Sequence, residues 1–278
     1  MAKVESWFGD VCELARAAAN KAMARSTAQI DVIEKGQGDW ASQVDLEIED
    51  DIRRGLLSIA PGTAIHGEEG GYMQGERDNA APRFVWHVDP IDGSANYIRG
   101  IPHYATVISL TERHSDGSEQ VVMGVTADPC RQECFAALHD RPTTLNGKPV
   151  TVSEQKVPIS ALLAVVTPTP TASYIDFFGT WFTQQLRQFG GVRRSGAMAI
   201  DLAWVACGRL DAFVGFNLAP WDIRAGLCQV AHAGGVSRTP KQVGESPSLS
   251  PVAPEFCLAA NSETLFTKLL GDLYAGSN

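Results

Sequence analysis

The sequence predicts a layered fold in which an α+β half is followed by an α/β half. Two features of the order of segments support this prediction. Helical periodicity comes first and gives way to closely spaced β-rich runs, and beyond residue 160 β-rich and helical runs alternate. The chain has 278 residues, of which 44% are hydrophobic, so it is long enough for one large domain or two modest ones with packed cores.

Two amphipathic helices are expected near the N-terminus. Apolar residues recur at helical spacing between residues 4 and 18, and a second helix led by Asp45 carries apolar residues on one face. We expect the opposite, acidic face of this second helix to be solvated; its carboxylates are Glu47, Glu49, Asp50 and Asp51. Short β-rich runs separated by turn signals follow, at residues 63–67, 84–88, 106–111, 120–126 and 133–138.

Strands and helices alternate in the second half of the chain. Strands are expected at residues 162–167, 192–194, 212–216 and 256–260. Helices are expected at residues 174–189, 197–207, 222–233 and 263–274. The stretch 239–254 is rich in Pro, Ser and Gly and is expected to be a loop. We place a domain boundary near the turn Asn146-Gly147, which gives two domains, 1–145 and 146–278.

Composition narrows the classes of partner and the cellular location. The net charge of −9 argues against binding to a nucleic-acid backbone. No secretory signal and no apolar run of membrane-spanning length are evident, so we expect a cytoplasmic protein without membrane attachment. The six cysteines are scattered and are expected to be reduced; Cys130 and Cys134 lack a second Cys or His pair at zinc spacing.

The most informative segment is residues 86–97. Asp89 and Asp92 end an apolar run and are followed at once by Gly93-Ser94-Ala95. Carboxylate oxygens are the ligands that Mg²⁺ prefers, and backbone N–H groups at a helix start attract phosphate oxygens. A site that holds Mg²⁺ and phosphate together would activate a water molecule for attack on the phosphoryl group, and Ser94 would orient that water. The structural alternative is an Asp-Pro/Asp-Gly turn in which Ser94 caps a helix.

Three further acidic segments have both a functional and a structural interpretation. Glu68 and Glu69 follow an apolar run and precede two glycines, which suits either metal ligands or a solvated loop pair. Asp222 follows Pro220-Trp221 and fits either a ligand or a helix cap. Asp45 lies six residues after Asp39, and a helix cap is its structural alternative.

In order and spacing these segments resemble the inositol monophosphatase family, part of the lithium-sensitive, magnesium-dependent phosphatase superfamily that includes fructose-1,6-bisphosphatases. The family form Asp-Pro-Ile/Leu-Asp-Gly-Thr/Ser-x-Asn-Phe/Tyr is met by residues 89–97. The form Trp-Asp-x-x-Ala-Gly is met by residues 221–226, and Gly-Glu-Glu by residues 67–69. An Asp-x-Val-Thr-x-x-Asp element is echoed by residues 39–45, with Ser42 in place of Thr.

This resemblance implies a fold, a metal set and a mechanism. The fold would be a layered α-β-α-β-α sandwich in which residues 1–145 carry most ligands and residues 146–278 close the site. Two or three Mg²⁺ ions would be held by Glu68, Asp89, the Ile91 carbonyl, Asp92 and Asp222. The catalytic residues would be Glu68, Asp92, Ser94 and Asp45, the last helping to hold the more weakly bound metal. Activated water would attack phosphorus in line, without a phosphoenzyme, and lithium would inhibit.

The implied substrate contacts are Gly93, Ser94 and Ala95 for phosphate, with Gly196, Ala197, Asn217 and Asp222 lining the rest. The sequence departs from the family here. Gly215 stands where typical members have a Glu that contacts substrate hydroxyls, and Asn217 is a nearby replacement. Met198 makes the wall formed by residues 196–198 bulkier and less polar than the family's. We therefore doubt that myo-inositol phosphate is the best substrate, since unpaired buried polar groups weaken binding.

We thus expect a Mg²⁺-dependent phosphomonoesterase, commonly a homodimer in this family, acting on a small phosphorylated alcohol such as inositol 1-phosphate. Residues 96–102 resemble the histidinol-phosphate phosphatase branch, which is the second candidate. A fructose-1,6-bisphosphatase, a nucleotide 3′-phosphatase and a regulatory, non-catalytic member are further candidates. His66, His87 and His103 are expected to be neighbours of the site rather than ligands, because an oxygen-rich site selects Mg²⁺. Arg99 is interpreted as a surface arginine, with a place at the mouth of the site as the alternative. Arg193 and Arg194 are expected to have a surface or interface role, with phosphate binding as the alternative.

Overall fold

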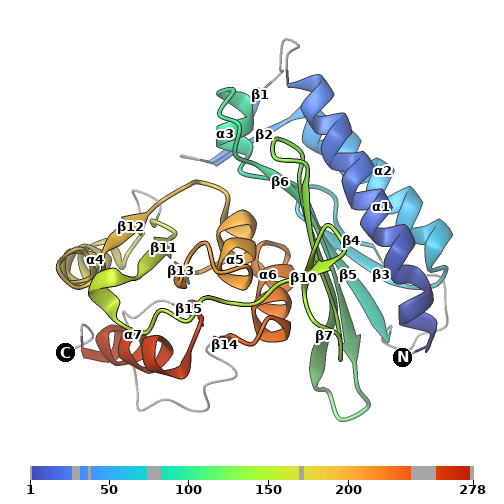
Figure 1. Cartoon of the computed structure of the whole chain (residues 1–278). Helices are drawn as coiled ribbons and strands as arrows, with labels where there is room; N and C mark the ends of the chain where they lie inside the picture. Colours follow the sequence, from blue (N-terminus) through green and yellow to red (C-terminus); the bar gives the residue numbers. More distant parts are fainter. Residues whose placement is uncertain are drawn as a thin grey trace.

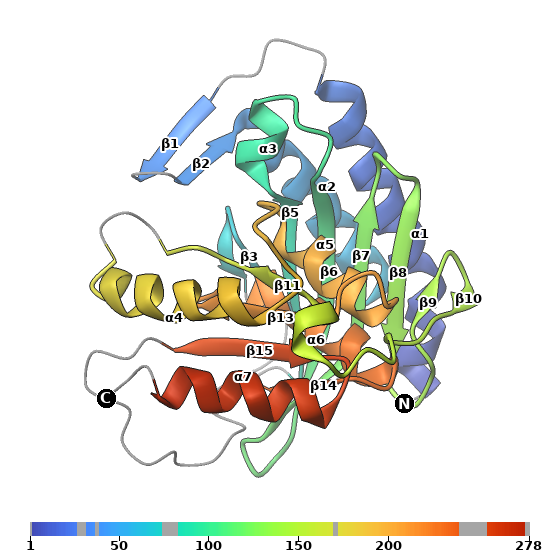
Figure 2. The same cartoon turned by 60° about the vertical axis from the view of Figure 1, so that its left-hand side comes forward.

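The chain folds into five layers of alternating helices and sheets (Figures 1 and 2). The computed structural model describes residues 2–26, 32–36, 39–73, 83–168, 172–238 and 255–275. Helices α1 (Ala2–Arg25) and α2 (Gln43–Ile59) cover one face of a large sheet, and α5 (Met198–Ala206) and α6 (Pro220–His232) cover the other. A smaller sheet follows, with α4 (Ile175–Gln188) and α7 (Glu263–Ala275) beyond it. The predicted α-β-α-β-α sandwich is confirmed.

The large sheet has eight strands in the order β10-β9-β8-β7-β6-β5-β3-β4. Their bounds are β3 (Ala64–Gly67), β4 (Gly71–Met73), β5 (Phe84–Asp92), β6 (Ala105–Arg113), β7 (Glu119–Asp128), β8 (Glu133–Leu138), β9 (Thr144–Leu145) and β10 (Lys148–Pro149). All neighbours are antiparallel except β3 and β5, which are parallel. Helices cover both faces of β5, so its apolar run is buried on both sides.

The smaller sheet has five strands in the order β12-β11-β13-β15-β14. Their bounds are β11 (Leu162–Val165), β12 (Gly191–Arg193), β13 (Ala212–Phe216), β14 (Val236–Arg238) and β15 (Phe256–Ala260). β11 is parallel to β12 and β13, as expected for strands joined through helices, and β15 is antiparallel to β13 and β14. The chain changes sheets between β10 and β11; the domain boundary at residues 145 and 146 stays a prediction.

Each interface between layers has its own buried cluster. Trp7, Ile48 and Trp86 belong to the cluster between α1, α2 and the large sheet. Two more clusters occupy the opposite faces of the small sheet: one contains Trp181 and the other Phe213. The six cysteines are free, as expected. Among the described residues, no helix is long and apolar enough to cross a membrane.

Most predicted elements are present, with shifted ends, and the elements that the sequence did not predict are short. These are β1 (Val32–Gly36), β2 (Asp39–Ser42), β4, β9, β10, β14 and the 3₁₀ turn Pro158–Ser160. Runs of two to five residues carry too little periodicity to be recognised. The expected loop at residues 239–254 lies outside the described residues.

Two details of α2 differ from the sequence prediction. Ser42, not Asp45, is the N-cap residue; Asp45 is the third helical residue and completes a capping box with Ser42. The expectation that the whole acidic face is solvated is wrong for Glu49, which is only 2% exposed. Glu49 is buried because it has hydrogen-bond partners in the neighbouring loop, which the helical periodicity could not reveal.

Helix α6 lies unusually close to strand β7. A Cβ atom added at Gly124 would be 2.6 Å from the carbonyl oxygen of Ala225 and 2.7 Å from its Cα. These are backbone atoms of a helix that also packs against β5 and β6, so they cannot yield as a flexible side chain would. Glycine at position 124 therefore sets the distance between α6 and the large sheet.

We expect Gly124→Ala to lower the free energy of unfolding by about 1–3 kcal/mol, because α6 must move away from the sheet. Gly271→Ala is the matched control: no atom of the described chain lies within 4 Å of an added Cβ in this exposed part of α7. That control should be neutral or stabilising by about 0.5–1 kcal/mol. Urea denaturation measures both, and equal stabilities of the two variants would contradict this packing argument.

Candidate active site

Four carboxylates from three segments meet at one end of strand β5. Because β3 is parallel to β5, the residue after β3 lies beside the end of β5, and the N–H of Glu68 donates to the Val88 carbonyl at 3.1 Å. Asp89 and Asp92 lie on β5 itself, and Asp222 comes from the first turn of α6. The irregular register of β5 against β6 between Asp89 and Asp92 marks the same place.

Asp89 lies at the centre of this group. It is 2% exposed, and its Oδ1 accepts the N–H of Ile91 at 2.9 Å. Burial raises the pKa of Asp89 well above its ordinary value, and the charges of Glu68, Asp92 and Asp222 raise it further. Like charges confined in a region of low dielectric repel strongly, so the group favours either a bound proton or a cation.

Asp92 connects the large sheet to α5. Its two oxygens accept the N–H groups of Met198 at 3.1 Å and Ala199 at 2.8 Å, at the start of that helix. The positive end of a helix stabilises a carboxylate, and these two bonds lower the pKa of Asp92. Burial, followed by the charge of Asp222, acts more strongly in the opposite sense, and the net pKa is raised well above the ordinary value.

Ala219, not Asp222, is the N-cap residue of α6; Asp222 is the third helical residue, and its role as a metal ligand stays a prediction. Its Oδ2 accepts the N–H of Ala219 at 2.9 Å, so it closes the first turn of α6. Its charge also raises the pKa values of Asp89 and Asp92. The cap geometry therefore fixes Asp222 beside the other carboxylates, and the structural and functional interpretations are compatible.

Ser94 lies between Asp45 and the turn at the end of β5. Its Oγ is 3.1 Å from Oδ1 of Asp45 and 2.9 Å from the Ile91 carbonyl oxygen. A hydroxyl has one proton to donate, so these two acceptors compete for it. Asp45 is 1% exposed and also accepts the N–H and Oγ–H of Ser42 at 2.8 and 2.6 Å. Burial raises the pKa of Asp45, and the bonds from Ser42 and Ser94 oppose that rise.

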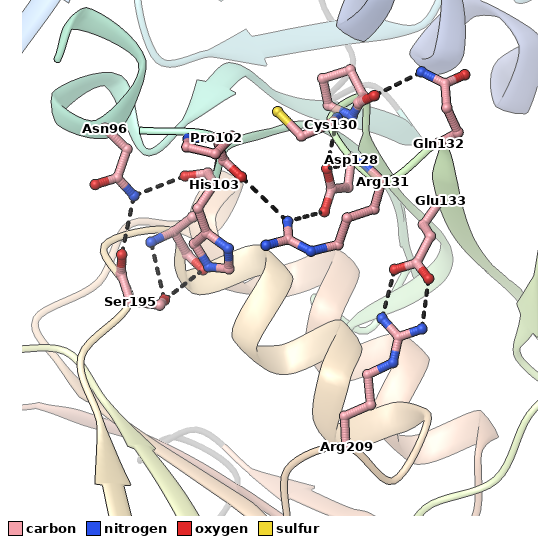
Figure 3. A network of polar contacts seen from close by, with 12 residues as sticks. Asn96, Pro102, His103, Asp128, Cys130, Arg131, Gln132, Glu133, Ser195 and Arg209 are labelled. Atoms are coloured by element: carbon pink, nitrogen blue, oxygen red, sulfur yellow. Dashed lines mark hydrogen bonds and ion pairs between the residues drawn. The ribbon is translucent and has the colours of Figure 1, made fainter. Parts of the chain in front are cut away.

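The segment after Asp92 passes close to the loop before α5. Gly93 has a φ of +93°, and a Cβ there would be 3.0 Å from the Gly196 carbonyl oxygen and 3.1 Å from Cβ of Ala197. Asn96 of α3 (Ser94–Ile98) donates to the carbonyls of His103 at 2.8 Å and Ser195 at 3.0 Å (Figure 3). Helix α3 and the loop at residues 195–197 are thereby fixed to each other.

The donors in this group fit a hard divalent cation. They are carboxylate oxygens with a backbone carbonyl nearby, which is the set that Mg²⁺ prefers. Within the part of the chain that the structure describes, no three His, Cys, Asp or Glu side chains are arranged as a formed metal site. Several oxygens instead accept backbone N–H groups, and an oxygen with two lone pairs can keep such a bond while it binds a cation.

Three residues mark the departure of this chain from the family pattern: the expected substrate contact Asn217, together with Gly215 and Met198. Asn217 is exposed, has a φ of +51° and opposes the burial that raises the pKa of Tyr174, the residue before α4. A Cβ at Gly215 would be 2.4 Å from Cδ1 of Leu218, so an apolar side chain occupies the space beside Gly215. Met198 is partly buried, and its N–H is bonded to Asp92.

Arg224 is a residue near the site that the sequence did not single out. It extends from α6 across to the large sheet and contacts Nε2 of His87 at 3.0 Å, Oγ1 of Thr111 at 2.6 Å and Glu119 at 2.9 Å. Burial, then the Arg224 charge, lowers the pKa of His87 to about 2, so its imidazole is neutral. An Arg two residues after Asp222 in the helix was the available signal, and only the packing gave it partners.

The other histidines and arginines singled out from the sequence have separate surroundings. His66 lies edge-on to Trp221 with ring centroids 4.9 Å apart, and His103 lies edge-on to Trp204 at 5.3 Å. Arg99, Arg193 and Arg194 are exposed, and Arg194 donates to Oγ1 of Thr167 at 3.2 Å. Their roles in function stay predictions.

Asp201 is another buried carboxylate close to the site, and the sequence did not single it out. It is 2% exposed and its Oδ2 accepts the Oγ–H of Ser195 at 2.7 Å, while Oδ1 is buried without a partner among the described residues. Burial raises the pKa of Asp201 to about 7. Its charge contributes to the raised pKa of Asp92, so it belongs to the electrostatics of the site.

One family of known proteins matches this chain over most of its length. The inositol monophosphatase family matches residues 4–274. This chain belongs to the inositol monophosphatase family. The resemblance inferred from the four sequence segments is thereby confirmed, and membership supports a phosphatase activity in a family that is generally metal-dependent.

Individual members of the family are similar over most of the chain. A Nus factor SuhB of Pseudomonas aeruginosa is 38% identical over 76% of this chain and 78% of that protein. An inositol-1-monophosphatase of Rhizobium meliloti is 33% identical over 79% of this chain and 80% of its own length. The extragenic suppressor protein suhB from Bartonella henselae has a crystal structure that matches with a TM-score of 0.83 at 27% identity, over 95% of this chain and 97% of that one.

The raised pKa of Asp201 predicts a pH-dependent stability. Between about pH 4 and 7 the folded protein keeps a proton on this carboxyl that the unfolded protein has already lost. The free energy of unfolding therefore falls as pH rises through that range. The amide introduced by Asp201→Asn cannot ionise. We expect this variant to gain about 1–3 kcal/mol relative to the parent protein between pH 5 and pH 8.

Urea denaturation of both proteins at the two pH values measures this gain. The control is Asp10→Asn, on the exposed side of α1, whose difference from the parent should change by less than about 0.5 kcal/mol between the two pH values. A difference for Asp201→Asn that is the same at pH 5 and pH 8 would show that Asp201 is ionised in the folded protein over the whole range.

Proposed function

We propose that this protein is a Mg²⁺-dependent phosphomonoesterase that hydrolyses a small phosphorylated alcohol such as inositol 1-phosphate. The observation that carries the proposal is the buried carboxylate group of Asp89, with Glu68, Asp92 and Asp222 close enough to raise its pKa. Holding these like charges close together is costly without a counter-charge. The glycine-flanked start of α3 lies directly beside it.

The metal ligands in this proposal are Glu68, Asp89, the Ile91 carbonyl, Asp92 and Asp222, which would hold two or three Mg²⁺ ions. When bound, Mg²⁺ would supply a lowered pKa for attacking water and a counter-charge for the phosphoryl oxygens. Backbone N–H groups at the starts of α5 and α6 hold the carboxylates of Asp92 and Asp222 in place. Pre-arranged ligands reduce the cost of ordering on binding.

The remaining proposed roles belong to uncharged groups and to Asp45. Ser94 would orient the attacking water through its hydroxyl oxygen, which lies within hydrogen-bond distance of Asp45 and the Ile91 carbonyl. Backbone N–H groups of Gly93, Ser94 and Ala95 would bind the phosphate. Glu68, Asp92, Ser94 and Asp45 are the catalytic residues of the proposal.

The surroundings of residues 198 and 215 favour a substrate with few hydroxyls. Leu218 occupies the space beside Gly215. We propose that Gly196, Ala197, Asn217 and Asp222 line the pocket, and Met198 comes next in the chain after Ala197. An apolar wall leaves substrate hydroxyls unpaired at a cost of about 1–3 kcal/mol each. Within the proposal, histidinol phosphate is therefore the alternative to inositol 1-phosphate. Fructose 1,6-bisphosphate and nucleotide 3′-phosphates require contacts for a second phosphate or a base.

A second candidate function comes from the names of similar proteins. Nus factor SuhB of Pseudomonas aeruginosa is 38% identical to this chain, and a protein of the same name from Xylella fastidiosa is 35% identical. A Nus-factor role is thus the specific form of the regulatory alternative. A homodimer, a cytoplasmic location and the absence of a nucleic-acid partner stay predictions, the last of which a Nus-factor role would put to the test.

Phosphate release with Mg²⁺ tests the proposal across inositol 1-phosphate, histidinol phosphate, fructose 1,6-bisphosphate, 3′-phosphoadenosine 5′-phosphate and glycerol 2-phosphate. We expect one small monoester to be preferred, and Asp92→Asn to lose at least about 10³-fold in kcat because a ligand and its charge are removed. Circular dichroism confirms that the variant is folded. Release by Asp92→Asn equal to the parent, or no Mg²⁺-dependent release from any substrate, would favour the regulatory candidate.

A further inference from the structure

Glu49 of α2 lies buried beneath the loop that carries Glu68. Its Oε2 accepts the N–H of Glu69 at 2.8 Å, and its Oε1 accepts the N–H of Gly70 at 2.8 Å. Oε1 also accepts Nε–H of Arg53, one helical turn further along α2, at 2.8 Å. The side chain of Glu49 is only 3% exposed, so three donors satisfy a carboxylate that water does not reach.

The glycines of the segment Gly67-Glu68-Glu69-Gly70 are explained by this carboxylate. A Cβ at Gly67 would lie 2.4 Å from Cδ and Oε1 of Glu49, and a Cβ at Gly70 would lie 2.8 Å from Oε1. Real Cβ contacts are not this short, so any side chain at either position would displace Glu49. The loop backbone therefore packs directly against the Glu49 carboxylate, with no space for a side chain at Gly67 or Gly70.

Arg53 connects the same assembly to the far end of the loop. Its Nη2 donates to the carbonyl of Gly71 at 2.7 Å, where β4 begins, and its side chain is 9% exposed. The near end is held by the bond from the Glu68 N–H to the Val88 carbonyl of β5. Glu68 thus lies between a fixed attachment on β5 and three contacts on α2.

We propose that Glu49 is a positioning residue that sets the direction of the Glu68 side chain and thereby the affinity of the carboxylate group for a divalent cation. This proposal rests on the function proposed above. Groups that orient a metal ligand typically change metal affinity by about 10–100-fold when removed. Here the orientation is transmitted through the backbone: the N–H groups of Glu69 and Gly70 follow Glu68 directly.

Only an acceptor with two oxygens and a negative charge suits this place. Two backbone N–H groups and one guanidinium point at Glu49, and all of them are donors. In the Glu49→Gln variant, the side-chain amide would direct its own N–H₂ at one of these donors and lose the charge-assisted bond to Arg53. The substitution changes the size of the side chain hardly at all, so it tests the hydrogen bonds rather than the packing.

The test measures binding of Mn²⁺, used as a probe for the divalent cation, by isothermal titration calorimetry on the full chain. We expect Glu49→Gln to weaken binding about tenfold, and Glu68→Gln to weaken it at least as much. Asp50→Asn is the matched control: it removes one charge from the adjacent, largely exposed position of α2 and should leave the dissociation constant unchanged. Gly67→Ala, which leaves Glu49 intact but displaces it, should reproduce the effect of Glu49→Gln.

Amide hydrogen exchange in metal-free protein is the second measurement, because it reports the loop without relying on activity. We expect the amides of Glu69 and Gly70 to exchange at least about tenfold faster in Glu49→Gln, and amides in β6 to be unchanged. A purely structural role would instead lower Tm and speed exchange throughout α2. If Glu49→Gln does not fold, Gly67→Ala and its exchange pattern decide the matter.

The outcomes separate this proposal from the one it rests on. Unchanged Mn²⁺ affinity and unchanged loop exchange in Glu49→Gln, while Glu68→Gln loses affinity, would overturn the positioning role and leave the phosphatase proposal intact. Absence of Mn²⁺ binding to the parent protein, or equal binding by the parent and Glu68→Gln, would overturn the metal-site proposal and the positioning role with it. Weaker binding confined to Glu49→Gln, Gly67→Ala and Glu68→Gln supports both.

Discussion

Repulsion between buried carboxylates is the constraint on which the rest of this structure depends. Asp89 is 2% exposed, and its burial, followed by the charges of Glu68, Asp92 and Asp222, raises its pKa well above the ordinary value. Such a group lowers stability unless a proton or a cation neutralises it. The fold must therefore hold these side chains together against their mutual repulsion, and much of the architecture near β5 has that effect.

Contacts between the layers provide this restraint. The start of α5 donates two N–H groups to Asp92, and Asn96 attaches α3 to the loop that precedes α5. On the other side, Arg224 attaches α6 to Thr111 and Glu119 of the large sheet. Each contact joins the half of the chain that contains the large sheet to the half that contains the small one. The carboxylates lie where the halves meet, so the site depends on their packing.

The acidic segments and the positions that depart from the family pattern lie on different elements. The four segments that identify the inositol monophosphatase family lie at the ends of β3 and β5 and at the start of α2 and α6, where backbone geometry fixes them. The positions at which the sequence departs from the family lie on β13 and at the start of α5: Gly215 is in β13, where Leu218 fills the space that a larger side chain would require, and Met198 is the first residue of α5.

The sequence by itself determined the layered fold, the main helices and strands, and the four acidic segments, because each depends on periodicity or on motifs within a few neighbouring residues. Only the tertiary structure decided which distant residues act on those segments. Glu49 has the sequence pattern of a solvated helix face, yet it is buried because the N–H groups of Glu69 and Gly70 face it. Arg224 likewise acquires its role from partners on the large sheet, and Asp201 acquires its role from its electrostatic effect on Asp92 of β5. Hydrogen bonds between residues twenty or more than a hundred positions apart depend on packing, which the local pattern of a sequence does not encode.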